Sequence, residues 1–242
     1  MKPLLYIFAV FMLGMVIAAC NKADKSTLET GKQEKDSISV AHVSKEPSTI
    51  FENDYARVFI ESLEPGQQQT EHEGVARVIY SLNDYLIEWN ENGQNLGTKE
   101  WKMGDVHFHK PGNHFAKNLS NKPAEWLVFV RTTTELPACE SMNPKKDATA
   151  FNQEFATLLN EDENFKVVKI KLGPGKMIPK HDGLNRLVYS LSDYKLSYTD
   201  EKGISNDKEY RKGDMHWHDG CAHSIKNTGT TEAEFILVSF KK

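Results

Sequence analysis

The chain has 242 residues, and its 30 Lys and Arg against 34 Asp and Glu give a formal net charge of −4. Basic residues are spread along the chain, whereas a nucleic-acid-binding surface needs Lys and Arg clustered on one face, so we expect no nucleic-acid partner. The length allows one large or two small domains. The share of apolar residues, 39%, is ordinary for a globular protein.

Residues 1–20 have the pattern of a signal peptide, with Lys2 at the start, an apolar stretch over residues 4–17 and small residues before a cleavage point. The apolar stretch is too short for a comfortable membrane span. Residues 17–20, with the letters IAAC, resemble the lipobox of bacterial lipoproteins. The resemblance implies cleavage before Cys20 and lipid attached to this cysteine. The alternative is a plain signal peptide that happens to contain Cys20.

Residues 21–46 are polar, rich in Lys, Glu and Ser, and nearly free of large apolar side chains. Such a segment cannot bury a core, so it predicts a flexible tether between membrane and folded protein. Asn21 follows the lipidation site, where Asp would suggest inner-membrane retention. We therefore expect a protein of the cell envelope, anchored by lipid on the periplasmic side, with the outer membrane favoured.

From residue 47 the pattern changes to short apolar runs that end at turn residues. Runs rich in Val, Ile, Phe and Trp recur, and Pro-Gly, Asn-Asp and Asn-Gly pairs separate them. Many short strands with turns every eight to twelve residues predict an all-β sandwich or barrel.

A different pattern lies between the two halves of the chain. Ala148, Phe151, Phe155 and Leu158 recur at helical spacing after Asp147, a suitable N-cap. This predicts a connecting helix from residue 147 to about 158. Its end stays open, because residues 157–159 align with residues 48–50 and equally suit a strand.

The segment predicted to fold contains an internal sequence duplication. Gly104-Asp105 recurs as Gly213-Asp214, a displacement of 109 residues (213 − 104), and the match runs without a net gap from residues 58–130 to residues 167–239. Such internal repeats decide the fold. We therefore expect a first domain at 47–133, a connector at 134–156 and a second domain at 157–242.

Eight of the nine histidines fall into pairs related by this displacement: His72/His181, His107/His216, His109/His218 and His114/His223. His107 and His109 alternate with apolar residues, so on a strand both imidazoles project from one face. Three histidines with an open coordination position suit a catalytic metal. The alternative is a set of partly buried side chains that hold neighbouring strands by hydrogen bonds, and retention of all four pairs favours a site.

Two further pairs are candidate ligand-binding residues. Arg77 and Arg186 have the geometry to clamp a carboxylate or phosphate, and a surface salt bridge is the alternative. Tyr80 and Tyr189 are candidates for lining a pocket, although tyrosine on a strand also suits a core.

Two cysteines remain beyond Cys20. Cys139 lies between the repeats and Cys221 lies in the second one. An oxidising compartment permits a disulfide between them, but the sequence does not establish their separation, so we leave the bridge open.

In each repeat, Pro-Gly, a histidine, Gly-Asp, a second histidine and an asparagine follow in order. In the first repeat these are Pro65-Gly66, His72, Gly104-Asp105, His114 and Asn118. This order resembles the two-motif signature of the cupin superfamily, matched twice. The resemblance implies two tandem double-stranded β-helix barrels of jelly-roll type, joined by a short helical connector. It also implies that His72, His114, His181 and His223 point into the barrel mouths.

The motifs depart from the cupin pattern at two metal ligands. The second histidine of the first motif is Gly74 in one repeat and Gly183 in the other, and the glutamate positions hold Val78-Ile79 and Leu187-Val188. A divalent transition metal (Fe, Mn, Zn, Ni or Cu, which the sequence does not distinguish) therefore needs a nitrogen from His107 or His109, or from His216 or His218.

Two functions follow, and a purely structural envelope protein, for which the sequence has no feature of its own, is a third interpretation. The first is an envelope-anchored bicupin that binds a small polar or anionic ligand, with or without a histidine-bound metal. The second is a metal-dependent enzyme of dioxygenase, isomerase or decarboxylase type with a three-histidine site. The sequence decides neither between them nor whether the protein forms a homo-oligomer.

Overall fold

The structure is a computed structural model that describes residues 47–241. The predicted signal peptide, the predicted lipidation site Cys20, the predicted tether and His42 lie outside the described residues. Within the described part, no helix has the length and apolar character needed to cross a membrane.

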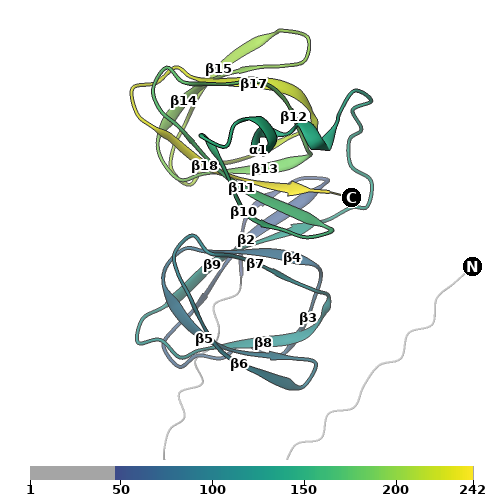
Figure 1. The fold of residues 1–242 in the computed structure, drawn as a ribbon. Helices are drawn as coiled ribbons and strands as arrows, with labels where there is room; N and C mark the ends of the chain where they lie inside the picture. The colour runs from purple at the N-terminus through teal and green to yellow at the C-terminus, as the bar shows by residue number, and fades with distance from the viewer. Residues whose placement is uncertain (1–46, 242) are drawn as a thin grey trace, which may run out of the picture. The chain divides into compact units, whose positions relative to one another are not determined.

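The first repeat forms two antiparallel sheets (Figure 1). The five-stranded sheet has the order β1 (Ser48–Glu52), β2 (Ala56–Leu63), β9 (Ala124–Arg131), β4 (Arg77–Ser81) and β7 (Val106–His109). The four-stranded sheet has the order β3 (His72–Gly74), β8 (Gly112–Asn118), β5 (Tyr85–Glu91) and β6 (Gln94–Trp101). We call this pair of sheets the first barrel.

The second repeat has the same strand order, and we call it the second barrel. Its five-stranded sheet runs β10 (Ala156–Glu161), β11 (Phe165–Leu172), β18 (Ala233–Phe240), β13 (Arg186–Ser190) and β16 (Met215–His218). Its four-stranded sheet runs β12 (Met177–Gly183), β17 (Cys221–Asn227), β14 (Tyr194–Thr199) and β15 (Ser205–Tyr210). The predicted all-β fold of two tandem barrels is confirmed.

Side chains that alternate along the strands of the five-stranded sheets contribute to two different hydrophobic clusters, one on each face of the sheet. On β4, Ile79 belongs to the interior core of the first barrel, whereas Val78 belongs to a second cluster that also contains residues of the second barrel. On β9, Phe129 faces this shared cluster and is fully buried. Burying a large apolar side chain contributes about 1.5–3 kcal/mol. Since a domain of this size buries a modest core alone, the shared cluster stabilises both barrels.

Tyr80 and Tyr189 belong to this shared cluster. Their ring centroids lie 6.4 Å apart in an edge arrangement, and Tyr80 is buried there. The expectation that these tyrosines line ligand pockets is therefore corrected: they stand on the faces of β4 and β13 opposite to Arg77 and Arg186.

The connector is less helical than predicted. It contains a short 3-10 helix, η1 (Pro144–Lys146), and one helical turn, α1 (Ala148–Phe151). Asp147 caps α1 as expected, because its side chain accepts a hydrogen bond from the Thr149 backbone N–H at 3.1 Å. The predicted extension to about residue 158 is wrong, and the alternative of a strand at residues 157–159 is confirmed. From Ala156 onward the backbone pairs with β11, and this tertiary pairing outweighs the local helical pattern.

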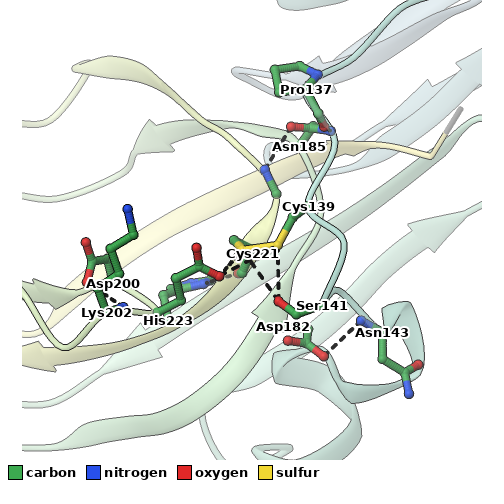
Figure 2. Close-up of a disulfide and its surroundings, with 12 residues drawn as sticks. Pro137, Cys139, Ser141, Asn143, Asp182, Asn185, Asp200, Lys202, Cys221 and His223 are labelled. Carbon is green, nitrogen blue, oxygen red and sulfur yellow. Dashed lines mark hydrogen bonds between the residues drawn. A yellow bond between two sulfur atoms is a disulfide. The ribbon is translucent and has the colours of Figure 1, made fainter.

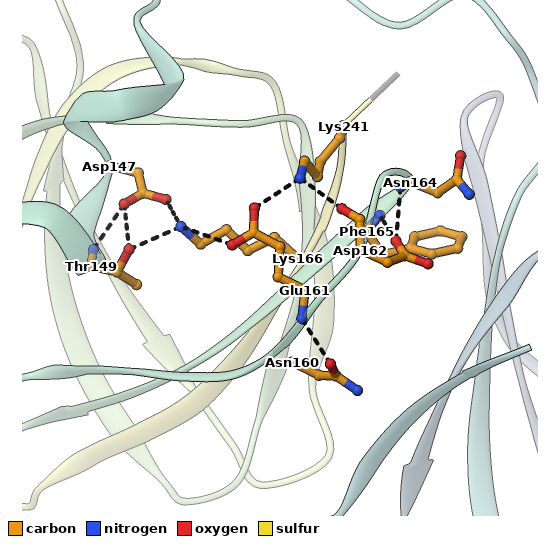
Figure 3. Close-up of polar contacts among 9 residues, drawn as sticks. All are labelled: Asp147, Thr149, Asn160, Glu161, Asp162, Asn164, Phe165, Lys166 and Lys241. Carbon is orange, nitrogen blue, oxygen red and sulfur yellow. Dashed lines mark hydrogen bonds and ion pairs between the residues drawn. The ribbon is translucent and has the colours of Figure 1, made fainter.

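A disulfide and a group of polar contacts attach the connector to the second barrel. Cys139 and Cys221 form the disulfide (Figure 2), which the sequence left open. The Asn143 backbone N–H donates to Asp182 Oδ2 at 3.0 Å. Lys166 of β11 contacts Asp147, the cap of α1 (Figure 3).

Candidate functional site

A cavity of about 180 Å³ lies in the first barrel. Its wall combines three imidazoles, three indoles, a guanidinium, an ammonium group, a phenol, a carboxyl group and a carboxamide, contributed by His107, His109, His114, Trp89, Trp101, Trp126, Arg77, Lys99, Tyr85, Glu61 and Gln69. The cavity therefore offers both charge and aromatic surface to a ligand.

His107 and His109 reach the cavity because of the alternation on β7. Val106 and Phe108 pack against the cluster shared by the barrels, which turns the two histidines inward. The His107 ring stacks on Trp101 with centroids 3.8 Å apart. Burial lowers the pKa of His107 to about 3 and that of His109 to about 2, so both imidazoles are neutral near pH 7. The question that alternation left open is thus answered: this face points inward.

His72 and His114 pair across strands β3 and β8, with ring centroids 4.2 Å apart. His114 is buried and lines the cavity, whereas His72 is exposed and does not. His72 Nδ1 contacts the Thr70 carbonyl oxygen at 2.9 Å. The structure therefore brings three of the four predicted histidines of this repeat into one wall and leaves the fourth outside it.

Arg77 forms a hydrogen bond with His114, and both side chains line the cavity. Arg77 Nη2 lies 2.6 Å from His114 Nε2. Since a guanidinium only donates hydrogen bonds, Nε2 is the acceptor and the imidazole proton resides on Nδ1, which donates to the Gly112 carbonyl at 3.1 Å. Burial lowers the pKa of Arg77 to about 10, so the side chain remains a cation at neutral pH.

Gly74 provides the space for this guanidinium. A Cβ atom at residue 74 would lie 2.3 Å from Arg77 Nη1 and 2.4 Å from His114 Cε1. The cupin resemblance puts the second metal-binding histidine at this position. In this chain residue 74 is a glycine, and the guanidinium of Arg77 occupies the space that a side chain there would need.

The second barrel repeats the arrangement. Arg186 Nη2 donates to His223 Nε2 at 2.9 Å. A Cβ atom at Gly183 would lie 2.4 Å from Arg186 Nη1 and 2.6 Å from His223 Cε1. The glycine and the arginine that occupies the space beside it therefore occur together in both repeats.

The residues as arranged do not fit the predicted three-histidine metal centre. The Nε2 lone pairs of His114 and His223 already accept from a guanidinium, and a fixed cation beside them disfavours a second cation. Among residues 47–241, three ligand-type side chains converge within 4.8 Å only at Cys139, Glu201 and Cys221, where the two sulfur atoms form the disulfide.

Arg77 and Arg186 do not form the surface salt bridges that were their alternative reading. They are only 5% and 3% exposed, and within the described part of the chain neither forms an ion pair with a carboxylate. A buried cation without a close ion-pair partner is unfavourable, so Arg77, which lines the larger of the two histidine-lined cavities, is the guanidinium that can receive an anion.

Two cavity residues escaped the sequence analysis. Gln69 Nε2 donates to Glu61 Oε2 at 2.9 Å, and burial raises the pKa of the Glu61 carboxyl, partly offset by His72. A search for residues kept in both repeats cannot find them, because their counterparts are Ile170 and Ile178. The available signal in the sequence was Glu61 itself, an acidic residue within a predicted apolar strand.

The corresponding cavity of the second barrel measures about 40 Å³. Arg186, His216, His218, His223 and also His181 line it, as the repeat predicts. Isoleucines occupy the positions of three smaller or polar residues of the first barrel: Ile170 for Glu61, Ile178 for Gln69 and Ile225 for Ala116. Ala148 of α1 adds to the same wall. The second barrel keeps the cationic and imidazole groups but has little room.

No family model matches the sequence, and no curated protein is similar to it. Solved structures are similar in fold. The oxalate decarboxylase of Bacillus subtilis, which has Mn(II) centres, is 14% identical, with 83% of this chain and 78% of that chain covered at a TM-score of 0.56. AerE from Microcystis aeruginosa is 16% identical, with 81% and 97% covered at 0.54. Procruciferin, an 11S globulin from Brassica napus, is 8% identical, with 77% and 76% covered at 0.55.

These identities establish the fold and leave the activity open, since one fold hosts many functions. The strand order, the repeated histidine motifs and the similar structures agree. Each of the two repeats has the fold of a cupin barrel, and residues 47–241 together have the fold of a two-barrel cupin.

Proposed function

We propose that this protein is a lipid-anchored envelope bicupin whose first barrel binds a small anionic ligand. One observation carries the proposal: the cavity of about 180 Å³ contains a buried arginine, Arg77, without an ion-pair partner among the described residues. The anchor rests on Cys20 and the envelope location on the signal-peptide pattern.

The electrostatics of the wall favour an anion. Arg77 is cationic, whereas His107, His109 and His114 have pKa values lowered to about 3, 2 and 4 and are neutral at pH 7. Hydrogen bonds from a guanidinium to a carboxylate or phosphate are among the stronger polar contacts in proteins. The neutral imidazoles add hydrogen-bonding groups without adding charge.

The dimensions favour a small ligand. The cavity volume is below the roughly 300 Å³ at which sites for drug-sized molecules begin. The indoles of Trp89, Trp101 and Trp126 supply flat apolar surface around the charged group, so a compact anion with a short carbon skeleton suits the site.

A matched pair of variants tests the proposal. Three of the chain's four tryptophans line the cavity, so tryptophan fluorescence of the mature protein reports on binding of acetate, propanoate or phosphate. We expect Arg77→Met to weaken binding at least tenfold and Arg186→Met to leave it unchanged, because the second cavity has little room. Equal affinities in both variants would contradict the assignment to the first barrel, and thermal unfolding of each variant controls for misfolding.

The second candidate function is a metal-dependent enzyme. It is favoured by a single observation: His107 Nδ1 and its counterpart His216 Nδ1 are buried without a hydrogen-bond partner in the described structure, and such a nitrogen is free to ligate a divalent metal. Arg77 beside His114 weighs against it. We expect the mature protein, purified without a chelator, to carry no stoichiometric transition metal by mass spectrometry. One equivalent that disappears in His107→Ala would favour the enzyme instead.

A further inference from the structure

We propose that the ligand of the first barrel is bifunctional, with its anionic group at Arg77 and a hydrogen-bond donor, a hydroxyl or ammonium group, at Glu61. The ligand class is thus a small hydroxy- or amino-carboxylic acid. This inference rests on the proposed binding of an anion at Arg77 and adds a second point of recognition.

The second barrel shows that the fold does not need a polar residue at these positions. Ile170 and Ile178 stand where the first barrel has Glu61 and Gln69, and both isoleucines are fully buried. A polar group in an apolar surrounding destabilises the fold unless its hydrogen bonds are made. The first barrel nevertheless has two such groups, side by side, in the barrel that has room for a ligand.

Hydrogen bonds hold the Glu61 carboxyl in place. Gln69 Oε1 accepts from the Ala116 backbone N–H at 2.9 Å, which orients the amide so that Nε2 donates to Glu61 Oε2 at 2.9 Å. A carboxylate accepts up to about four hydrogen bonds. Glu61 is therefore a preorganised acceptor with capacity left for a donor in the cavity.

Glu61 favours the charged form of Arg77 through space without forming an ion pair with it. Both side chains line the cavity, but in the described residues they do not approach within the 4.0 Å of an ion pair. The wall thus presents a cation and an acceptor at separate points, and a ligand with an anionic group and a donor complements both.

Ala116, whose small side chain leaves room in the first cavity, also differs between the two barrels. Ala116 lies at the position of Ile225 and lines the first cavity. The polar pair and the free volume therefore occur together in one barrel and are replaced together by three isoleucines in the other.

Three acids with one carbon skeleton test the inference: propanoate carries no donor, lactate adds a hydroxyl group and alanine adds an ammonium group. Tryptophan fluorescence of the mature protein measures their affinities. We expect lactate or alanine to bind at least tenfold more tightly than propanoate, since a buried polar group left without its partner strongly disfavours the analogue that lacks it.

The variants Glu61→Ile and Gln69→Ile copy the second barrel. We expect Glu61→Ile to abolish the preference over propanoate while propanoate binding persists, and Gln69→Ile to reduce it. Binding of propanoate that depends on Arg77, with no preference for lactate or alanine, would overturn this inference and leave anion binding intact. If none of the three acids binds, the proposed function itself fails.

Discussion

The guanidinium of Arg77 donates to His114 Nε2 at 2.6 Å inside the first barrel, and Arg186 repeats the contact with His223 in the second. Each arginine uses space that a glycine leaves free, Gly74 or Gly183. The departure of the sequence from the cupin metal motif therefore has a structural counterpart, an arginine–histidine pair that faces a cavity.

Replacing Gly74 with Ala is expected to weaken anion binding by about ten- to a hundredfold, since a hydrogen bond to a charged group contributes about 1.5–3 kcal/mol. The new Cβ would lie 2.3 Å from Arg77 Nη1 and must displace the guanidinium. Fluorescence titration measures the affinity. Gly183→Ala introduces a similar clash in the second barrel and is the matched control: it should lower stability about as much without affecting binding, and a loss of binding in both variants would contradict the prediction.

Ala116→Ile is expected to fill the first cavity and abolish ligand binding while the protein stays folded, because Ile225 occupies the same position in the second barrel. The reverse change, Ile225→Ala, removes buried methyl groups and should lower the free energy of unfolding by about 2–5 kcal/mol. Calorimetry and fluorescence titration check both. Unchanged binding in Ala116→Ile would mean that the ligand lies elsewhere.

Lowering the pH is expected to destabilise the protein. The loss of stability should begin at a pH well above the pKa values that the buried histidines have in the folded protein. Burial lowers the pKa of His109 and His218 to about 2, and that of His216 to about 4, whereas histidine in an unfolded chain has a pKa near 6.5. Below about pH 6.5 the unfolded chain therefore binds protons that the folded protein does not. The stabilisation present above this pH is lost as the pH falls toward 4.

Each such histidine contributes about 1.4 kcal/mol per pH unit in this range. Urea unfolding between pH 7.5 and 4.5 measures the slope. His218→Gln removes one of these groups from the barrel with the small cavity and should reduce the slope by about one proton. A free energy of unfolding that stays constant down to pH 5 would show that the histidines titrate normally.

Removal of the Cys139–Cys221 disulfide is expected to lower the free energy of unfolding by roughly 2–5 kcal/mol, because the bridge spans 82 residues and constrains the unfolded chain. The double variant Cys139→Ser/Cys221→Ser and the reduced native protein should agree in their unfolding midpoints. If reduction leaves the midpoint unchanged, the bridge does not form in the purified protein.

The repeat, the turns and the short apolar runs were sufficient to predict two all-β barrels. The alternation of Val106 and Phe108 with His107 and His109 predicted that the two histidines share a face. The error over Tyr80 came from neglecting the same rule. Residues 77 and 80 differ by an odd number, so on one strand Arg77 and Tyr80 cannot both face the cavity.

Tertiary structure alone decided which face of each strand is the inside and which barrel has room. The alternation of side chains along a strand does not tell which face of the sheet points into the barrel. The packing of the two barrels against each other through Phe129 and Val238 decides this. The site also joins residues that lie far apart in sequence, such as Arg77 with His114 and Glu61 with Gln69. Their roles depend on distances and burial, which residue spacing along a chain does not determine. The sequence by itself thus determined the repeated barrel and its motif histidines, and the packed structure determined the arginine–histidine pair and the difference in room between the histidine-lined cavities of the two barrels.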